Sequence, residues 1–185
     1  MEPIRAGIKL TYAEYRTLPE TGPRYQLLEG QLVMTPAPSF RHQTVVARLF
    51  AALFNFAEPR RLGVVRAAPL DVILGAETVL QPDIVYLSNT RRGLIAEEGV
   101  RGAPDLCVEV LSPHSREFDL GAKRALYAQH GVLEYWAVDP DANTVEVDRL
   151  QQAGVAPGRS FGASDSVSTL LLPGLSILLR DVFAP

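Results

Sequence analysis

The sequence predicts an α/β fold in which a mixed β-sheet is flanked by helices. Two observations predict it: a long helical period of apolar residues early in the chain, and a series of β-branched runs after it that are too short for helices. The expected order is helix, hairpin, long helix, strands, helix and hairpin. This order fits a mixed sheet better than a doubly wound parallel one.

Helices are predicted where capping residues precede an apolar period. Thr11, followed by a glutamate three residues later, has the form of a capping box and predicts a short helix to residue 18. Ser39 is a typical N-cap for a core helix over residues 40–57, where apolar residues recur at spacings of three and four. A further helix over 115–130 ends at Gly131, a residue typical of helix C-termini.

Short apolar runs bounded by turn residues predict the strands. They cover residues 24–28, 31–34, 64–67, 70–74, 84–87, 106–111, 134–138, 144–150 and 167–172. The first two form an N-terminal hairpin around Glu29-Gly30. The last segment, 175–183, follows a turn at Pro173-Gly174 and is expected to be a strand or a short helix.

Composition limits the class of protein. A chain of 185 residues suits one domain, so we expect residues 1–185 to form a single unit. Hydrophobic residues make up 47% and charged residues 21%, which excludes a disordered polyelectrolyte and a coiled coil. The single cysteine, Cys107, excludes a cysteine-based zinc cluster and agrees with a reducing compartment.

The sequence also predicts where the protein works and what it can bind. No apolar run approaches the roughly 18 residues of a membrane span, and the N-terminus has no continuous apolar segment. We therefore expect a cytoplasmic protein that does not enter a membrane. Because the net charge is −3, any nucleic-acid partner must meet a local basic patch rather than a generally basic surface.

Glu109 is the most unusual residue of the predicted core. It interrupts an apolar run, 106–111, in which Leu106, Val108 and Val110 face one way while Cys107, Glu109 and Leu111 face the other. A buried carboxylate needs a cation, a set of hydrogen bonds or a proton to offset a desolvation cost of several kcal/mol. A structural role for Glu109, in a buried ion pair, is the alternative to a functional one.

Asp83 opens another buried strand directly after Pro82. Carboxylates at neighbouring strand positions form a hard oxygen site, which suits Mg²⁺ or Mn²⁺. Glu29, in the hairpin turn, is a candidate third carboxylate if the hairpin packs near the sheet edge. For Asp83 alone, strand-end capping or a surface ion pair is the simpler interpretation. Asp105 fits a strand-entry residue better than a ligand.

The candidate basic residues each have a plain alternative. Lys123 follows Asp119 by four positions, as in a solvated helical ion pair, but its functional interpretation is a cation aimed at a phosphate or an attacking water. His42 shares the apolar face of the long helix, so a partly buried structural histidine is the default. Arg41, Arg48, Arg91, Arg92, Arg116 and Arg124 are candidates for a phosphate-contacting rim or ordinary surface residues.

Four blocks together resemble the Uma2 family, also called DUF820. In order they are YQLLEGQLVMTPAPS from Tyr25, QPDIVYLS from Gln81, APDLCVEVLSP from Ala103, and DLGAKR from Asp119 continuing to GVLEYWAVDP. The resemblance covers about residues 11–150. That family is placed among the PD-(D/E)XK nucleases, so the resemblance implies a restriction-endonuclease-like core that binds a divalent metal and hydrolyses phosphodiesters.

The resemblance also implies roles for single residues. Asp83 matches the aspartate of the motif and Glu109 its second acid, while the lysine expected two residues later is replaced by Leu111. Lys123 then stands where the family is thought to have moved its lysine. These residues imply a Mg²⁺ site, with Mn²⁺ as a substitute, held by Asp83, Glu109 and the Val110 carbonyl.

The remaining implied roles concern the periphery of that site. Glu29 matches an acidic residue near the start of such cores and is expected to assist catalysis. His42 matches a family histidine, and with Arg116 and Arg124 it is expected to bind substrate.

Three hypotheses follow. The first is a metal-dependent endonuclease acting on DNA, which cuts one strand per active site and acts on duplex as a homodimer. The second is a nuclease-fold module that binds nucleic acid or protein without cleaving it. The third is a purely structural Glu109–Lys123 ion pair with no metal. The apolar runs 170–172 and 175–179 are the candidate dimer face.

Overall fold

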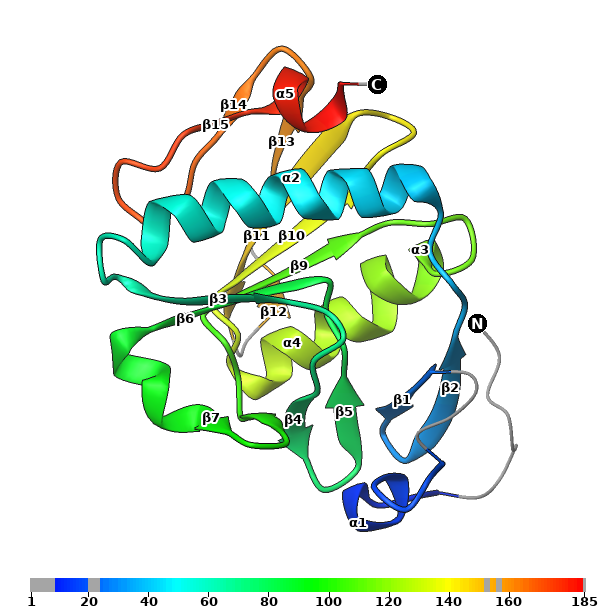
Figure 1. Cartoon of the computed structure of the whole chain (residues 1–185). Helices are drawn as coiled ribbons and strands as arrows, with labels where there is room; N and C mark the ends of the chain where they lie inside the picture. Colours follow the sequence, from blue (N-terminus) through cyan, green and yellow to red (C-terminus); the bar gives the residue numbers. More distant parts are fainter. Residues whose placement is uncertain (1–8, 20–23, 152–153, 156–157, 185) are drawn as a thin grey trace.

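The centre of the molecule is a mixed sheet whose strand order is β12-β11-β10-β9-β6-β3, with β13 added beside β11 (Figure 1). The computed structural model describes residues 9–19, 24–151, 154–155 and 158–184. Strands β9 and β10 run parallel, whereas β6 pairs antiparallel with both β3 and β9. The strands are β3 (Gly63–Ala67), β6 (Ile84–Ser88), β9 (Leu106–Val110), β10 (Glu134–Asp139), β11 (Thr144–Gln151), β12 (Gly154–Val155) and β13 (Arg159–Gly162).

A second sheet, in the order β2-β1-β5-β4-β8-β7, carries the N-terminal hairpin. The hairpin forms as the sequence predicts, with Glu29 at a φ of 48° in the turn between its strands. This sheet consists of β1 (Arg24–Leu28), β2 (Gln31–Thr35), β4 (Val72–Gly75), β5 (Thr78–Leu80), β7 (Ile95–Ala96) and β8 (Gly99–Arg101). The mixed α/β class that the sequence predicts is therefore confirmed.

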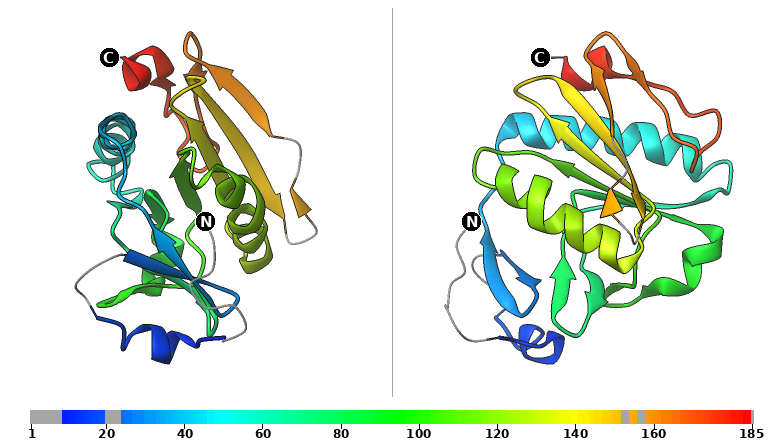
Figure 2. Two further views of the ribbon diagram at one scale, coloured as in Figure 1. Left: turned by 90° about the vertical axis from the view of Figure 1, so that its right-hand side faces the viewer. Right: turned by 180° about the vertical axis from the view of Figure 1, so that it is seen from behind.

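Helices cover both faces of the central sheet (Figure 2). The long helix α2 (Phe40–Ala57) has the predicted bounds and begins at Ser39, whose Oγ accepts a hydrogen bond from the His42 amide at 3.2 Å. Its apolar side packs with one set of β9 residues, Leu106, Val108 and Val110. The other set packs in a second core on the opposite face, with helix α4 (Arg124–His130). The alternation predicted for this strand is thus confirmed.

The helix predicted over 115–130 contains a change of helical type. It begins as α3 (Arg116–Phe118), widens into a π-helical turn η2 (Asp119–Lys123) and continues as α4, which ends at Gly131 with a φ of 89°. The π turn places Asp119 and Lys123 in the interior, where both side chains are buried. Such turns inside α-helices occur frequently at functional sites.

The C-terminal part corrects one prediction. Strand β14 covers only Ser166–Val167 and pairs with β15 (Ile177–Leu178), so the strand predicted over 167–172 does not form beyond its start. Leu172, Leu175 and most apolar neighbours after them are buried in the core under α2. Leu170 is 71% exposed, but most apolar side chains of the two runs complete the core and do not form a continuous exposed face.

Three short helices complete the described part of the chain: α1 (Tyr12–Tyr15), η1 (Asn89–Leu94) and α5 (Leu179–Phe183). Helix α1 has the predicted capping box but is shorter than expected. Among the described residues, no helix is both long and apolar enough to cross a membrane.

Candidate functional site

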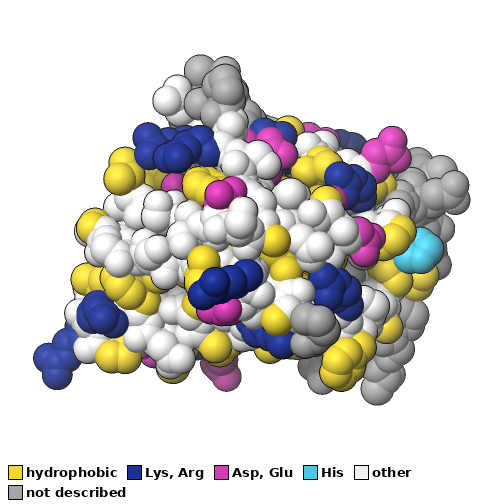
Figure 3. Space-filling view, turned by 90° about the horizontal axis from the view of Figure 1, so that it is seen from above, with side chains coloured by type: hydrophobic (Ala, Val, Ile, Leu, Met, Phe, Trp, Pro, Cys, Tyr) yellow, Lys and Arg dark blue, Asp and Glu magenta, His cyan; other side chains and the backbone are white. Residues whose placement is uncertain are grey.

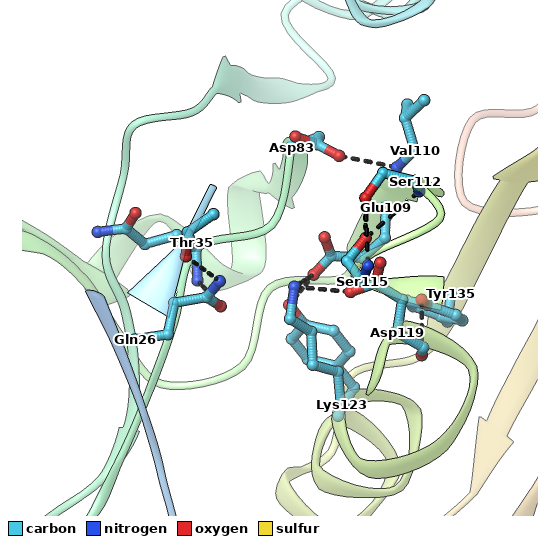
Figure 4. A network of polar contacts seen from close by, with 12 residues as sticks. Gln26, Thr35, Asp83, Glu109, Val110, Ser112, Ser115, Asp119, Lys123 and Tyr135 are labelled. Carbon is cyan, nitrogen blue, oxygen red and sulfur yellow. Dashed lines mark hydrogen bonds and ion pairs between the residues drawn. The ribbon is translucent and has the colours of Figure 1, made fainter. Parts of the chain in front are cut away.

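A pocket of about 320 Å³ lies where the start of α2, the N-terminal hairpin and one end of the central sheet meet. Strands β6 and β9 are antiparallel, and Ile84 pairs with Val108, so Asp83 and Glu109 come next in register at the same sheet edge. The two strands therefore bring both predicted carboxylates to the pocket, and the π turn adds Asp119 and Lys123 beside Glu109. Figure 4 shows these side chains converging, with Gln26 and Thr35 across from them.

Glu109 and Lys123 form the buried centre of the site. Each side chain is 4% exposed, and Lys123 Nζ lies 3.1 Å from Glu109 Oε1 and 2.8 Å from Asp119 Oδ1. The Tyr127 hydroxyl donates a further hydrogen bond to Glu109 Oε1 at 2.8 Å. The Asp119–Lys123 pair predicted at a spacing of four residues thus exists, but it is buried rather than solvated.

Burial controls the protonation of this centre. Burial raises the pKa of Glu109, and the negative charges of Asp119 and Asp83 raise it as well. Lys123 and the Tyr127 hydrogen bond lower the pKa, but by less than these effects raise it, so that the pKa is about 8. For Lys123, burial by itself lowers the pKa, but the negative charges of Glu109 and Asp119 outweigh it and raise the pKa above its usual value. Lys123 is therefore a permanent cation that faces two acidic side chains.

Asp83 is held from two sides. Its Oδ2 accepts a hydrogen bond from the Val110 amide at 2.7 Å, and His42 Nε2 lies 3.3 Å from the same oxygen. Burial alone would lower the pKa of His42, but the hydrogen bond and charge of Asp83, with the Val110 backbone, raise it overall. His42 thus contacts a carboxylate instead of projecting freely from the helix.

The donors around the pocket fit a hard divalent cation. The contacts described above use Asp83 Oδ2 and Glu109 Oε1, which leaves Asp83 Oδ1 and Glu109 Oε2 as oxygen donors. The Val110 backbone, which also interacts with His42, lines the pocket beside them. Among the described residues, no group of three or more His, Cys, Asp or Glu side chains is arranged to hold a metal by itself. Such a donor set suits Mg²⁺, which keeps several waters, and the pocket has room for them.

Three predicted site residues lie away from this centre. Glu29 is exposed in the β1–β2 turn and lines a separate cavity with Glu77 and His130, because the hairpin directs its turn away from the sheet edge. Arg116 pairs through Nη1 with Asp139 across the helix start, and its side chain is 53% exposed. Neither residue lines the pocket.

Arg124 is the third. Its Nη2 lies 2.7 Å from Asp148 Oδ1 and 3.4 Å from Glu146 Oε1, on the strand β11 side of the helix. The Asp148 side chain is fully buried, so the ion pair neutralises an interior charge. Asp105, by contrast, is a strand-entry residue as expected, since it accepts a hydrogen bond from the Ser88 amide at 2.6 Å.

Several residues of the pocket region have no functional role predicted from the sequence. Among them are Asp119 and Tyr127, which hold the centre, and Arg24 and Gln26, which line the wall formed by the hairpin. A signal for the first two was present, because Asp119, Lys123 and Tyr127 follow one another at intervals of four and share a helix face. No local pattern distinguishes Arg24 from the other arginines.

Comparison with known proteins assigns the chain to a family. The Uma2 family model, described as "Putative restriction endonuclease", matches residues 12–180. A search of curated proteins gave no match. A solved structure from Anabaena variabilis ATCC 29413, titled as a "putative nuclease belonging to DUF820", superposes with a TM-score of 0.80 at 24% identity and covers 95% of this chain and 98% of its own. That likeness shows the fold, and the family match over nearly the whole chain shows that this protein belongs to the Uma2 family.

Proposed function

We propose that this protein is a metal-dependent endonuclease that hydrolyses phosphodiester bonds of DNA, with Mg²⁺ as the metal and Mn²⁺ as a substitute. The observation that supports it most directly is the buried Lys123 in contact with Glu109, in a pocket open to solvent that Asp83 of the neighbouring strand also lines. The description of the Uma2 family supports a nuclease. The donor chemistry of the pocket favours a hard cation.

In this proposal Asp83, Glu109 and the Val110 carbonyl hold the cation. When bound, the metal polarises the phosphate and lowers the pKa of a bound water. His42 fixes the orientation of Asp83, and Tyr127 fixes that of Glu109. Hydrolysis forms a bond from the water oxygen to phosphorus and breaks one phosphorus–oxygen ester bond.

Lys123 supplies the positive charge of the protein at the reacting phosphate. An ammonium group has three donors, and Glu109 and Asp119 take two of them, so the third is left for the pocket. A cation fixed in this way stabilises the negative charge that grows on the phosphate oxygens in the transition state.

The test is cleavage of supercoiled plasmid with Mg²⁺, Mn²⁺ or EDTA. We expect wild-type protein to cleave only with a metal, and Glu109→Gln and Lys123→Ala to lose at least about a hundredfold in rate. Glu29→Gln is the matched control, because it changes a glutamate outside the pocket and is expected to cleave like wild type. Equal inactivity of all proteins, with plasmid binding retained, would support the non-cleaving binding module instead.

The homodimer belongs to the same proposal. One pocket per chain cuts one strand, so two copies are needed for a coordinated double-strand break. We expect linear plasmid to accumulate only at concentrations where light scattering shows a dimer. Linear product from a strictly monomeric protein, without prior nicking, would contradict this part.

A further inference from the structure

We propose that Arg24 binds a phosphate group of the nucleic-acid strand at the mouth of the pocket. The inference rests on the proposed function, since it identifies how that pocket holds its substrate. Arg24 is a different residue from Arg116 and Arg124, the arginines that the sequence predicts to bind substrate.

Arg24 occupies a fixed wall of the pocket. It is the first residue of β1, lies opposite Thr35 of β2 and is exposed. Gln26, two residues further on the same strand face, is 1% exposed and accepts a hydrogen bond from the Gln81 amide at 2.9 Å. Its Nε2 donates to Thr35 Oγ1 at 3.0 Å, so this end of the hairpin is anchored beside the pocket. Figure 4 shows Gln26 and Thr35 across from Lys123.

The other arginines near the site are engaged by the protein. Arg116 pairs with Asp139, and Arg124 pairs with the buried Asp148. Arg41 donates to a carbonyl and to an amide oxygen of the turn between β10 and β11, at 3.1 and 2.7 Å. Each of these three guanidinium groups therefore already has a partner within the protein.

Arg24 differs from these arginines in its position and in its contacts. Among the described residues that line the pocket it is the only arginine, and its guanidinium makes no hydrogen bond or ion pair with a described residue. A planar guanidinium can donate two parallel hydrogen bonds to a phosphate. An unengaged guanidinium on the pocket wall is thus well suited to a phosphodiester.

The charge balance of the pocket favours such a group. Its carboxylates belong to Asp83, Glu109 and Asp119, and the basic groups in contact with them, Lys123 and His42, are already paired with these acids. On the face above α2, basic side chains are scattered among acidic and apolar ones and form no continuous patch (Figure 3). With a net charge of −3, the chain needs a local cation to bring a polyanion to its acidic pocket.

The test measures binding of a fluorescein-labelled oligonucleotide by anisotropy, in EDTA, between about 0.05 and 0.2 M salt. Each lost phosphate contact reduces the slope of log K against log salt by about 0.7 for single strands and about 0.9 for duplex. At about 0.05 M salt this corresponds to binding that is about eight- to fifteenfold weaker for Arg24→Ala. Arg24→Lys keeps the charge and is expected to retain the wild-type slope.

Arg180→Ala is the matched control, because it removes an exposed arginine that pairs with Asp181 and lies outside the pocket. It is expected to keep the wild-type slope. An unchanged slope for Arg24→Ala, or an equal loss in Arg180→Ala, overturns the assignment, as does a wild-type protein that binds no oligonucleotide. Plasmid cleavage by wild type together with an unchanged Arg24→Ala slope refutes this inference alone. A reduced slope in a protein that never cleaves supports Arg24 and refutes the nuclease.

Discussion

Replacing Glu109 by glutamine removes one titratable carboxyl from a buried group that holds three carboxyls and one ammonium. Glutamine has nearly the same shape, and its amide oxygen can accept the hydrogen bonds that Tyr127 and Lys123 give to Glu109 Oε1. The change therefore tests charge with little change in packing. It distinguishes two hypotheses about Glu109: a metal-binding carboxylate that destabilises the metal-free protein, and a partner in a stabilising ion pair.

The magnitude follows from the pKa of Glu109, which burial raises from 4.5 to about 8. Between these two values the folded protein keeps a proton that the unfolded chain has released, so the stability of the wild type falls as pH rises. At 1.36 kcal/mol per pKa unit, the loss reaches about 5 kcal/mol above pH 8 and is under about 1 kcal/mol at pH 5. Glutamine does not titrate, so Glu109→Gln should be increasingly more stable than wild type across this range.

The assay is urea unfolding in EDTA at pH 5, 6, 7 and 8. Trp136 is the single tryptophan and is fully buried, so its fluorescence reports loss of the core. Glu117→Gln is the control for general pH effects, because Glu117 is exposed on α3. We expect the difference between Glu109→Gln and wild type to grow by about 3 to 4 kcal/mol from pH 5 to pH 8.

A Glu109→Gln protein that is less stable than wild type at pH 8 would refute this reasoning. It would mean that the ionised Glu109 gains more from Lys123 than it loses by burial, which is the structural ion-pair hypothesis. A pH-independent difference would show that Glu109 does not titrate between pH 5 and 8 in the folded protein.

Three further predictions concern the supporting contacts. Tyr127→Phe removes a hydroxyl that orients Glu109 and should lower the cleavage rate about tenfold; a wild-type rate would exclude that role. Arg124→Met leaves Asp148 unpaired in the interior and should lower the free energy of unfolding in urea by about 3 kcal/mol, and a change below about 1 kcal/mol would contradict a buried pair. At Asp139, burial raises the carboxyl pKa, but two backbone amides of the next turn and an arginine outweigh it and lower the pKa overall. This carboxylate stabilises the fold above its unfolded pKa of 3.8, and the contribution disappears as pH falls through the lower folded value. Asp139→Ala should therefore cost about 1 kcal/mol at pH 7 and less towards pH 3, whereas a constant cost in thermal melts would argue against the carboxylate.

Local patterns were sufficient for the elements that hold the site. The bounds of α2 follow from Ser39 and a helical period, and the two faces of β9 follow from strand alternation. Glu109 stood out because a carboxylate inside an apolar strand has few physical explanations. The sequence has no such signal for the π turn at Asp119. A π turn lengthens the backbone hydrogen-bond spacing by one residue, and the side chains still follow a helical pattern.

The sequence by itself thus determined the fold class, the main helix and the acids at the strand ends, because these depend on periodicities within a few residues of each other. Only the tertiary structure decided which charges share the pocket. Glu29 is directed into another cavity, Arg124 is engaged by Asp148 from β11, and Arg24 remains on the pocket wall. Ion pairs form between segments far apart in the chain, and the packing that brings those segments together leaves no local pattern in the sequence.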